Sequence, residues 1–443
     1  MKMYGVAALA AVLLVTGDVF AADGNAFEQT NLVANREGFG AAIVDPYMVD
    51  AWGIALRPPG AGGHIWISNA FTGTSSEYIG DVNEQALHQD GLTIVPVDTG
   101  AFADRGVALV TGQAYNAASD YAGQPVEFAV SGPAHDRSTT PGTDLGVVNG
   151  SAKFIFVTED GTINAWRANT VQAMDRAPVV IDYSKTGHFP SYDAANPVFT
   201  GVAITTRTAT VDEQRNATAN NLMYATDFRN NHINVFNNQW QDMTTSFSFE
   251  TPADIAAAGT NPALNMHVFN IQDIGNHLFV TYASFDPNGD EGFEQVTGAG
   301  LGKVVEYKED GTLVREFSDG GMLDAPWGVA IAPAGFGTFG GDLLVANFGD
   351  GTISAFDLAT GAYIDNLRDA AGNEISIDGI WGLTFGNGVS LGDANALYFT
   401  AGPNGEADGL FGRVTVAPEP AGGLLMAPAA LLLVRRRRVK VER

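Results

Sequence analysis

The chain contains no cysteine. It therefore cannot form disulfide bonds, thiolate metal sites or a cysteine nucleophile. Stability must come from burial of apolar side chains instead. The composition can supply such a core, because 45% of the 443 residues are hydrophobic.

Basic residues are scarce. The chain has 23 Lys and Arg against 50 Asp and Glu, which gives a formal net charge of −27. Six of the basic residues follow Pro420 with one acidic residue, so the rest of the chain carries a charge of −32. A surface of this charge repels the phosphates of nucleic acids and anionic lipids. We therefore expect no nucleic-acid partner, and either a solvated acidic surface or one that binds cations.

Common catalytic motifs are also missing. The chain has no Gly-x-Ser-x-Gly sequence, and its seven histidines do not form a His-Glu-x-x-His pattern. No phosphate loop or dinucleotide fingerprint precedes a convincing helix. These absences argue against a serine hydrolase of the elbow type, a zinc peptidase of this type and a nucleotide-dependent enzyme.

The N-terminal residues 1–21 have the pattern of a secretory signal peptide. Lys2 precedes an apolar run over residues 6–15, and the small residues Val19 and Ala21 come before the expected cleavage. The run is too short to span about 30 Å of hydrocarbon as a membrane anchor. We expect export to the periplasm, the cell surface or the extracellular space.

The C-terminal segment 417–443 combines a short motif, an apolar run and an arginine cluster. The motif is Pro418-Glu419-Pro420, the run covers residues 421–434, and the cluster is Arg435, Arg436, Arg437 and Arg438. Fourteen residues form roughly 21 Å of helix, which is short for a stable span. The arginines favour a cytoplasmic position for its end.

This order of parts resembles the PEP-CTERM sorting signal of Gram-negative bacteria, although residues 439–443 continue past the arginines. The resemblance implies transient membrane insertion and recognition by exosortase, a membrane protease that sorts such proteins. It also implies a setting in which exopolysaccharide is made. A plain C-terminal anchor is the alternative interpretation.

The stretch 324–356 has the pattern of a repeat unit. Three short apolar or alternating runs, at residues 327–331, 343–347 and 352–356, are joined by Gly and Asp turns. Such a pattern predicts most of one blade of a β-propeller. Six units align at positions 53, 112, 201, 271, 328 and 382, with tryptophan before the glycine in three of them: Trp52, Trp327 and Trp381.

The mean spacing of the units is about 66 residues, more than the roughly 40 to 50 of common propeller repeats. We therefore expect long surface loops, above all at residues 116–153, 205–221 and 286–302. The glycines are expected to let neighbouring inner strands approach closely. The tryptophans are expected to pack between neighbouring blades and to donate their indole N–H groups to carbonyls at the rim.

We predict an all-β fold, a six-bladed β-propeller over residues 22–416, followed by a short hydrophobic C-terminal helix. The last unit offers only three strands, and residues 29–35 have strand character without belonging to any unit. If this N-terminal strand pairs beside residues 411–416, it closes the ring and removes an exposed edge.

Ordered blocks along the chain resemble a conserved hypothetical family of bacterial secreted proteins, some of which carry the PEP-CTERM tail. The single units are also similar to the NHL repeats of six-bladed propellers. The resemblance implies fold and export, and no catalytic residue. The blocks include Asn31-Leu32-Val33, Ala51-Trp52-Gly53, residues 156–163, 224–230 and 269–272, Ala325-Pro326-Trp327-Gly328, residues 347–351 and 398–403.

Acidic and amide residues recur at corresponding places in the units. Three precede the inner strand, namely Asp50, Asp324 and Asp378, and four end or follow the second strand, namely Asn69, Asp160, Asp227 and Asn347. In a propeller these positions form rings at one end of the channel. Such a ring could bind Ca²⁺, or polarise an ester or lactone carbonyl through a metal. The alternative is that these side chains form Asx turns and bond to neighbouring backbone amides.

A second candidate metal site is Asp286, Asn288 and Asp290, with Glu294 close in sequence. Oxygen-bearing residues alternate there as in a calcium loop. The glycine expected at position six is replaced by Glu291, and no glutamate stands at position twelve. An acidic, solvated loop is the alternative.

Two functions fit these observations. The first is a secreted or surface-associated binding propeller that recognises an exopolysaccharide, a peptide or a surface protein. The second is a metal-dependent hydrolase or lyase, similar to a lactonase, that uses the acids at the channel end. We favour the binding protein and assign no catalytic residue.

Overall fold

The computed structural model describes residues 26–58, 62–100, 106–120, 126–136, 144–183, 196–205, 221–257, 265–289, 293–318 and 320–418. Strands dominate these ranges, in which the only α-helix is α2 (Ala253–Ala257), so the predicted all-β class is confirmed. None of the described segments forms a helix long and apolar enough to cross a membrane. The predicted signal peptide and the tail from Glu419 onward, with its expected helix, lie outside the described residues.

The described residues form seven mainly antiparallel sheets, and six of them contain, in chain order, the strands that carry the aligned positions of the repeat units. Sheet 1 contains β3 (Ala51–Ala55), β4 (Ile65–Asn69), β5 (Thr74–Tyr78) and β6 (Ile94–Pro96). Sheet 2 contains β7 (Val110–Tyr115), β10 (Phe154–Thr158), β11 (Thr162–Trp166) and β13 (Val179–Asp182). Sheet 3 contains β14 (Phe199–Ile204), β15 (Leu222–Asp227) and β16 (His232–Asn237).

The second half of the chain continues this pattern. Sheet 4 contains β17 (Met266–Ile274), β18 (His277–Asp286), β20 (Gly302–Lys308) and β21 (Leu313–Glu316), with β19 (Glu294–Val296) paired to β18. Sheet 5 contains β22 (Pro326–Ile331), β23 (Leu343–Asn347), β24 (Ile353–Phe356) and β25 (Tyr363–Asn366). Sheet 6 contains β26 (Ile380–Phe385), β27 (Leu397–Ala401), β28 (Leu410–Val416), β1 (Phe27–Ala34) and β2 (Ile43–Val44).

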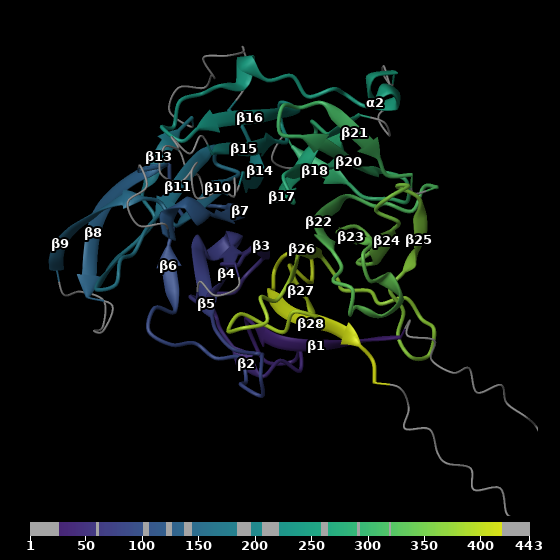
Figure 1. Cartoon of the computed structure of the whole chain (residues 1–443), viewed down its shortest axis with the longest axis horizontal. Helices are drawn as coiled ribbons and strands as arrows, with labels where there is room; N and C mark the ends of the chain where they lie inside the picture. The colour runs from purple at the N-terminus through teal and green to yellow at the C-terminus, as the bar shows by residue number, and fades with distance from the viewer. Residues whose placement is uncertain are drawn as a thin grey trace, which may run out of the picture.

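The first strands of the six sheets lie around one region at the centre of the view in Figure 1. In chain order, β3 contacts β7, β7 contacts β14, β14 contacts β17, β17 contacts β22 and β22 contacts β26, and β26 also contacts β3. Glycine makes this proximity possible. A Cβ atom on Gly53 would lie 2.7 Å from the carbonyl oxygen of Thr111, and one on Gly382 would lie 2.7 Å from that of Trp52. The predicted close approach at these glycines is confirmed.

The N-terminal strand belongs to the last sheet. β1 pairs with β28 in antiparallel fashion along nearly its whole length, which is the pairing that the sequence predicts. The Phe27 side chain of β1 is buried, and its ring centroid lies 4.9 Å from that of Phe336 in the connection between β22 and β23 of sheet 5. The first and last strands of the described chain therefore stabilise each other by pairing in one sheet.

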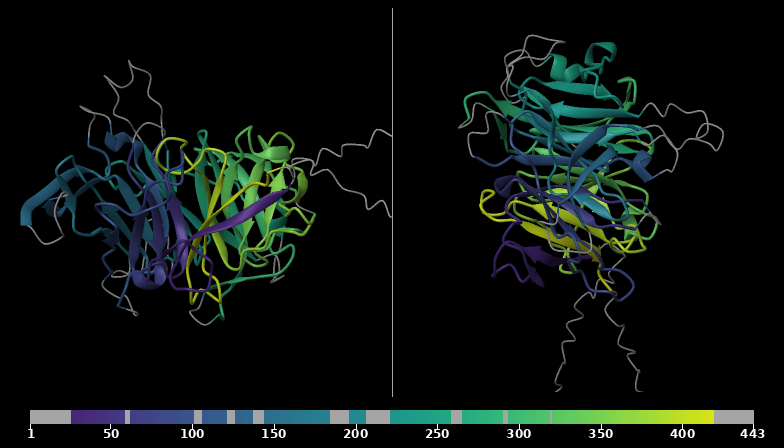
Figure 2. Two further views of the ribbon diagram at one scale, coloured as in Figure 1. Left: turned by 90° about the horizontal axis from the view of Figure 1, so that it is seen from below. Right: turned by 90° about the vertical axis from the view of Figure 1, so that its left-hand side faces the viewer.

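The insertion between β7 and β10 is more ordered than expected. The prediction of a surface loop over residues 116–153 is wrong for β8 (Ala129–Asp136) and β9 (Asp144–Ser151), which pair with each other, while β12 (Gln172–Met174) pairs with β8. This small sheet projects from the side of a flattened body (Figures 1 and 2). Val130 and Val148 are buried in the same core as Phe154, so apolar burial stabilises the strands.

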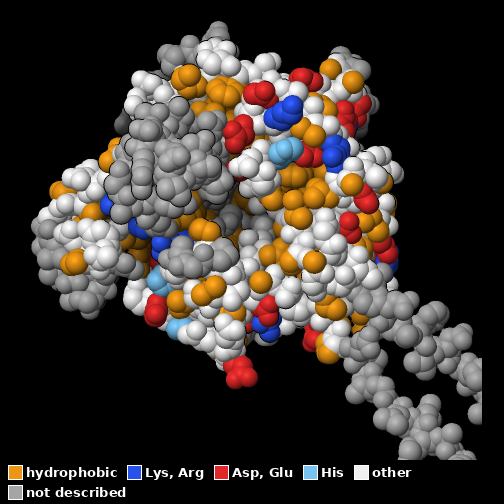
Figure 3. All heavy atoms as spheres, viewed as in Figure 1, with side chains coloured by type: hydrophobic (Ala, Val, Ile, Leu, Met, Phe, Trp, Pro, Cys, Tyr) orange, Lys and Arg blue, Asp and Glu red, His pale blue; other side chains and the backbone are white. Residues whose placement is uncertain are grey.

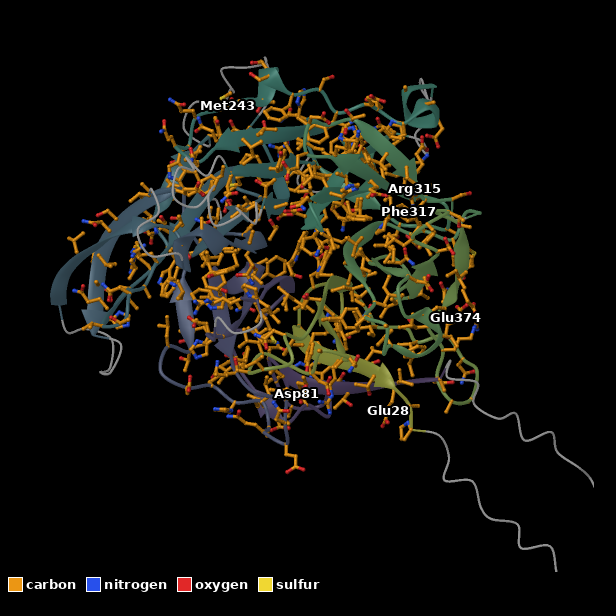
Figure 4. The ribbon with its side chains drawn as sticks, in the orientation of Figure 1. Glu28, Asp81, Met243, Arg315, Phe317 and Glu374 are labelled. Carbon is orange, nitrogen blue, oxygen red and sulfur yellow. The ribbon has the colours of Figure 1, made fainter. Side chains whose placement is uncertain are left out.

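Aromatic and aliphatic side chains fill the spaces between neighbouring sheets (Figure 4). One example is Trp66 of sheet 1, whose ring stacks on Phe154 of sheet 2 at 4.0 Å between centroids. Each such ring buries roughly 150–250 Å². Acidic side chains are spread over the face shown in Figure 3, as the composition predicts.

Candidate functional site

The three tryptophans that precede inner glycines gather in one cluster. The rings of Trp52 and Trp381 stack at 3.7 Å between centroids, and Trp327 meets them edge-on at 5.9 and 6.1 Å. Phe348 stacks on Trp381 at 4.0 Å. All three indoles are almost completely buried. They join sheets 1, 5 and 6 as a single aromatic group, where the sequence predicts separate contacts between pairs of blades.

Asp50 accepts hydrogen bonds from two of these indoles. Trp52 Nε1 donates to Oδ2 at 2.6 Å, and Trp381 Nε1 donates to Oδ1 at 3.2 Å. Trp327 Nε1 instead donates to the carbonyl oxygen of Thr200 at 3.1 Å. One indole of the three thus uses a carbonyl, as predicted, and the other two fix the orientation of one carboxylate.

The backbone explains why Asp50 occupies this place. Asp50 has a φ of 52°, and the residues that also stand two positions before a tryptophan, Ala325 and Gly379, have φ values of 44° and 63°. The left-handed turn is therefore common to the three tryptophan units. Only sheet 1 adds a carboxylate to it. Asp324 and Asp378, which the sequence suggests as equivalents of Asp50, stand one residue earlier in the turn.

Asp50 is buried, with 1% of its surface exposed. Burial raises the pKa of the Asp50 carboxyl well above its usual range, and the charges of Glu406 and Glu159 act in the same direction. The two indole donors oppose these effects. A positive charge placed beside Asp50 would stabilise its ionised form.

A cavity of about 400 Å³ opens next to Asp50. Unlike an ordinary apolar pocket, it is lined by both carboxylates and aromatic side chains. Its carboxylates are Asp50, Glu159, Glu294 and Glu406. Its aromatic side chains are Trp52, Phe71, Phe293 and Phe348. We call this site the acidic aromatic cavity.

The lining comes mostly from one kind of connection. Phe71 lies in the 3-10 helix η1 (Ala70–Thr72) that follows β4, Glu159 follows β10, Phe348 follows β23, and Glu406 lies between β27 and β28. Each of these turns joins the second strand of a sheet to its third. Sheet 4 contributes through the segment that contains β19. Five sheets therefore contribute to the cavity, each through the connection that follows its second strand.

Arg229 lies in the corresponding turn of sheet 3, after β15. Its guanidinium carbon is 4.7 Å from the ring centroid of Phe293, and Nη1 donates to the carbonyl oxygen of Asn196 at 2.8 Å. Burial lowers the pKa of Arg229, while the charges of Asp227 and Glu159 raise it. One guanidinium thus stands beside the wall of a cavity lined by four carboxylates.

Two of the predicted channel-end residues are amides buried inside sheets. Asn69 Nδ2 donates to the hydroxyls of Thr74 and Ser76 at 3.1 and 2.9 Å. Asn347 Nδ2 makes two bonds of 3.0 Å to hydroxyls in the following turn and in β24. Both side chains connect the second strand of their sheet to the next one.

Two predicted aspartates bond to the backbone ahead of an inner strand. Asp160 Oδ2 accepts a hydrogen bond from Leu109 N at 3.0 Å. Asp227 Oδ1 accepts bonds from Val198 N at 3.2 Å and from Asn230 N at 3.1 Å. Both carboxylates therefore tie the turn after the second strand to the start of the first strand.

The remaining two predicted aspartates also accept bonds from backbone amides. Asp324 Oδ1 accepts from Gly298 N at 2.6 Å, and burial raises the pKa of Asp324. Asp378 Oδ2 accepts from Asn404 N at 2.8 Å and is exposed. The structure thus brings Asp50 alone of the seven residues to the acidic aromatic cavity.

The candidate calcium loop is described only in part. Asp286 Oδ1 accepts a hydrogen bond from Asn288 N at 2.8 Å, as in an Asx turn, and Asp290 lies outside the described residues. Within the described part of the chain, no three Asp, Glu or His side chains are grouped so that they could hold a metal ion. Binding of Ca²⁺ stays a prediction.

Sequence reasoning did not select Phe71, Glu159, Phe348 and Glu406 as site residues. Three of them lie within two positions of a predicted site residue in the sequence. Phe71 is two residues after Asn69, Glu159 directly precedes Asp160, and Phe348 directly follows Asn347. An aromatic residue one or two positions after the Asn or Asp of a unit is the signal that could have found the aromatic members.

No protein-family model matches the chain. Three relatives are proteins of Acanthamoeba polyphaga mimivirus, named Uncharacterized protein R648, R640 and L690. R648 is 29% identical over 395 residues, which cover 86% of this chain and 78% of R648. R640 is 32% identical over 53% of this chain and 38% of its own length, and L690 is 35% identical over 44% and 49%. The bacterial source and the sorting tail therefore stay predictions.

Solved structures show a loose likeness. A catalytically inactive virginiamycin B lyase from Staphylococcus aureus with quinupristin has a TM-score of 0.41 and 13% identity, over 88% of this chain and 99% of the lyase. YCF48 bound to D1 peptide has a TM-score of 0.38 and 10% identity, over 90% of this chain and 97% of YCF48. The low identities and TM-scores carry no implication for activity.

Proposed function

We propose that the six sheets are the blades of a six-bladed β-propeller that covers residues 22–416. The contact of β26 with β3 supports this arrangement, because it brings the last inner strand beside the first. In this proposal β1 completes the last blade and closes the ring. Such a closure protects the outer edge of β28 from pairing with other chains.

The propeller is a binding protein, and the acidic aromatic cavity is its ligand site. The observation that carries this proposal is the convergence of five sheets on one cavity next to the buried Asp50. Loops on a rigid scaffold are common sites of recognition. The carboxylate of Asp50 is already oriented by two indoles, so binding would need little rearrangement there.

We place this protein outside the cytoplasm of a Gram-negative bacterium, on the basis of the sequences 1–21 and 417–443. An exosortase-type protease would remove the tail after transient membrane insertion, and exopolysaccharide or a surface protein would present the ligand. Mass spectrometry of the exported protein tests this part of the proposal. A mature form that starts near Ala22 and lacks Arg435 to Arg438 is expected, whereas retention of residues 1–21 would contradict a cleaved signal peptide and retention of Arg435 to Arg438 would contradict removal of the tail.

Glycan and peptide arrays test the binding function. We expect the wild type to bind a defined subset of ligands, and Phe348→Ala to lose that signal because it removes one aromatic wall. Tyr47→Ala serves as the matched control, since Tyr47 is 52% exposed and is not part of the cavity lining. Glu406→Gln provides a second cavity variant that keeps the size of the side chain. Unchanged binding by both cavity variants, with folding intact, would contradict the proposal.

The same proteins separate binding from catalysis. A panel of lactones, esters and glycans is assayed with Ca²⁺, with Zn²⁺ and with a chelator. We expect no turnover that depends on the metal. Chelator-sensitive turnover that is lost in Asp50→Asn would instead support the metal-dependent hydrolase or lyase.

A further inference from the structure

We propose that the acidic aromatic cavity binds an organic cation, an ammonium group carried on an apolar stem such as a lysine side chain or an alkyl amine. This inference rests on the proposed binding function and names the ligand class for the same site. It is drawn from the charge of the lining, its aromatic rings and the way Asp50 is held.

The charge of the lining favours a cation. Four carboxylates line the cavity, and Arg229 is the guanidinium that stands at its wall. Burial is the main cause of the raised pKa of Asp50, and the charges of Glu406 and Glu159 raise it further through like-charge repulsion. A bound ammonium group would relieve it and could form charge-assisted hydrogen bonds with the carboxylates.

The aromatic walls favour a cation that has an organic body. Aromatic faces attract ammonium and guanidinium groups through their quadrupoles. The protein already contains such a contact at this wall, because the Arg229 guanidinium carbon lies 4.7 Å from the Phe293 ring centroid. Trp52, Phe71 and Phe348 would bury the methylene groups of the ligand. A volume of about 400 Å³ suits a small organic ligand.

The geometry favours an ammonium over a bare metal ion. Ca²⁺ requires six to eight oxygen ligands at about 2.3–2.6 Å. Both oxygens of Asp50 already accept an indole N–H, and four of the ten lining residues are aromatic and offer no oxygen ligand from their rings. The described residues contain no group of three or more carboxylates or imidazoles arranged for a metal.

Ligand binding should be coupled to the proton on Asp50. The groups that act on this carboxyl are Glu406, Glu159 and the two indoles, with Arg229 near Glu159. Burial raises the pKa of Asp50, so a bound cation would lower that pKa again and release a proton. Affinity should therefore keep increasing with pH above about 4, the usual value for an aspartate.

Isothermal titration calorimetry of the full chain tests the ligand class. The probes are N-acetyl-lysine N-methylamide, its norleucine analogue, which lacks the ammonium group, 1,5-diaminopentane and CaCl₂. We expect saturable binding of the lysine probe and the diamine, and at least tenfold weaker binding of the norleucine probe. The diamine distinguishes recognition of the ammonium stem alone from recognition of a peptide backbone.

Variants locate the binding. We expect Glu406→Gln to weaken the binding of the lysine probe at least tenfold, which corresponds to about 1.4 kcal/mol. The same substitution should reduce the pH dependence of that affinity. Phe348→Ala should weaken the binding of both the lysine probe and the norleucine probe. The charge-matched control is Glu28→Gln, because Glu28 is exposed on β1 and lies at the outer edge of sheet 6 (Figure 4). This control should leave the Kd unchanged.

Three results would overturn the inference. If the lysine and norleucine probes bound with equal affinity, and Phe348→Ala abolished this binding, the ligand would not need to be a cation. The proposed binding function of the cavity would remain. Tight Ca²⁺ binding that displaces the lysine probe would replace the organic cation by a metal. A probe concentration of about 10 mM is tenfold above a weak Kd of about 1 mM. If neither the lysine probe nor the diamine bound at this concentration, organic cations would be rejected as the ligand class. If array ligands also bound independently of Phe348 and Glu406, the proposed binding function would fail as well.

Discussion

The two halves of the molecule use the same position of the repeat for different purposes. This position comes just before the aligned glycine or Ile271 of each inner strand. In sheets 5, 6 and 1, which we call the tryptophan half, it holds Trp327, Trp381 and Trp52. In sheets 2, 3 and 4, the polar half, it holds Thr111, Thr200 and Asn270.

The polar half connects neighbouring sheets by hydrogen bonds. The Thr111 hydroxyl donates to the carbonyl oxygen of Phe199 at 2.7 Å, and the Asn270 amide donates to that of Trp327 at 2.8 Å. Each bond joins an inner strand to the next one. At this repeat position the polar half therefore links its sheets without lining the cavity, although its turns contribute Glu159, Phe293 and Glu294 to that cavity.

The tryptophan half connects its sheets by stacking and buries an acid in doing so. The indoles of Trp52 and Trp381 donate to Asp50, which places a carboxylate in an apolar environment beside the cavity. A buried charge is costly unless it is paired. The comparison teaches that one repeat position can link neighbouring sheets by hydrogen bonds in one half and hold a carboxylate beside a cavity in the other.

The largest expected effect concerns the strand that completes the tryptophan half. Deletion of residues 27–34 removes β1, exposes the edge of β28 and leaves Phe336 without its contact to Phe27. We expect aggregation and no cooperative thermal transition, measured by scanning calorimetry. Glu28→Gln, which alters only an exposed side chain of the same strand, should retain the transition. An unchanged Tm after the deletion would contradict closure by β1.

The next effect concerns the indole cluster. Trp381→Ala removes a completely buried ring that contacts Trp52, Trp327 and Phe348. We expect the free energy of unfolding to fall by about 3–5 kcal/mol, measured by chemical denaturation. A loss below about 1 kcal/mol would mean that the cluster does not hold the tryptophan half together.

The third effect is the pH dependence that Asp50 contributes. Burial raises its pKa in the folded state, so its contribution to stability is fully present below the unfolded value of about 3.9 and is lost as the pH rises through the folded value. Compared with Asp50→Asn, the wild type should lose up to about 1.4 kcal/mol per pH unit in this window. Denaturation curves of both proteins at a series of pH values measure this. Parallel pH profiles would contradict a raised pKa.

The smallest effect is expected in the polar half. Thr200→Val keeps the shape of the side chain but removes the hydroxyl that donates to the carbonyl oxygen of Phe269 at 2.5 Å. We expect a loss of about 1 kcal/mol, measured by the same denaturation. If this loss equalled that of Trp381→Ala, hydrogen bonds in the polar half would stabilise the fold as much as the indole cluster does in the tryptophan half.

The sequence predicted much of the architecture because the repeat signals are local. Glycines at inner positions, alternating strands and Gly-Asp turns specify the strands, and the unassigned strand near residue 30 predicted the pairing of β1 with β28. The sheet formed by β8 and β9 was not predicted, since its residues belong to an insertion read as polar and rich in Gly, Asn, Asp or Thr.

The site was harder to predict because it depends on register within turns. Asp50, Asp324 and Asp378 look equivalent in sequence, yet only Asp50 stands two residues before its tryptophan and reaches the indoles. Asn347 and Phe348 are neighbours, and the first is buried in a sheet while the second lines the cavity. A shift of one residue changes where a side chain points, which no pattern of residue types can show.

The most direct test of the central claim is a crystal structure of the protein with bound N-acetyl-lysine N-methylamide. We expect the ammonium nitrogen inside the acidic aromatic cavity, about 2.7–2.9 Å from a carboxylate oxygen, with its stem against Phe348. Ligand density outside this cavity, or an empty cavity at a concentration that saturates the protein in calorimetry, would contradict the account.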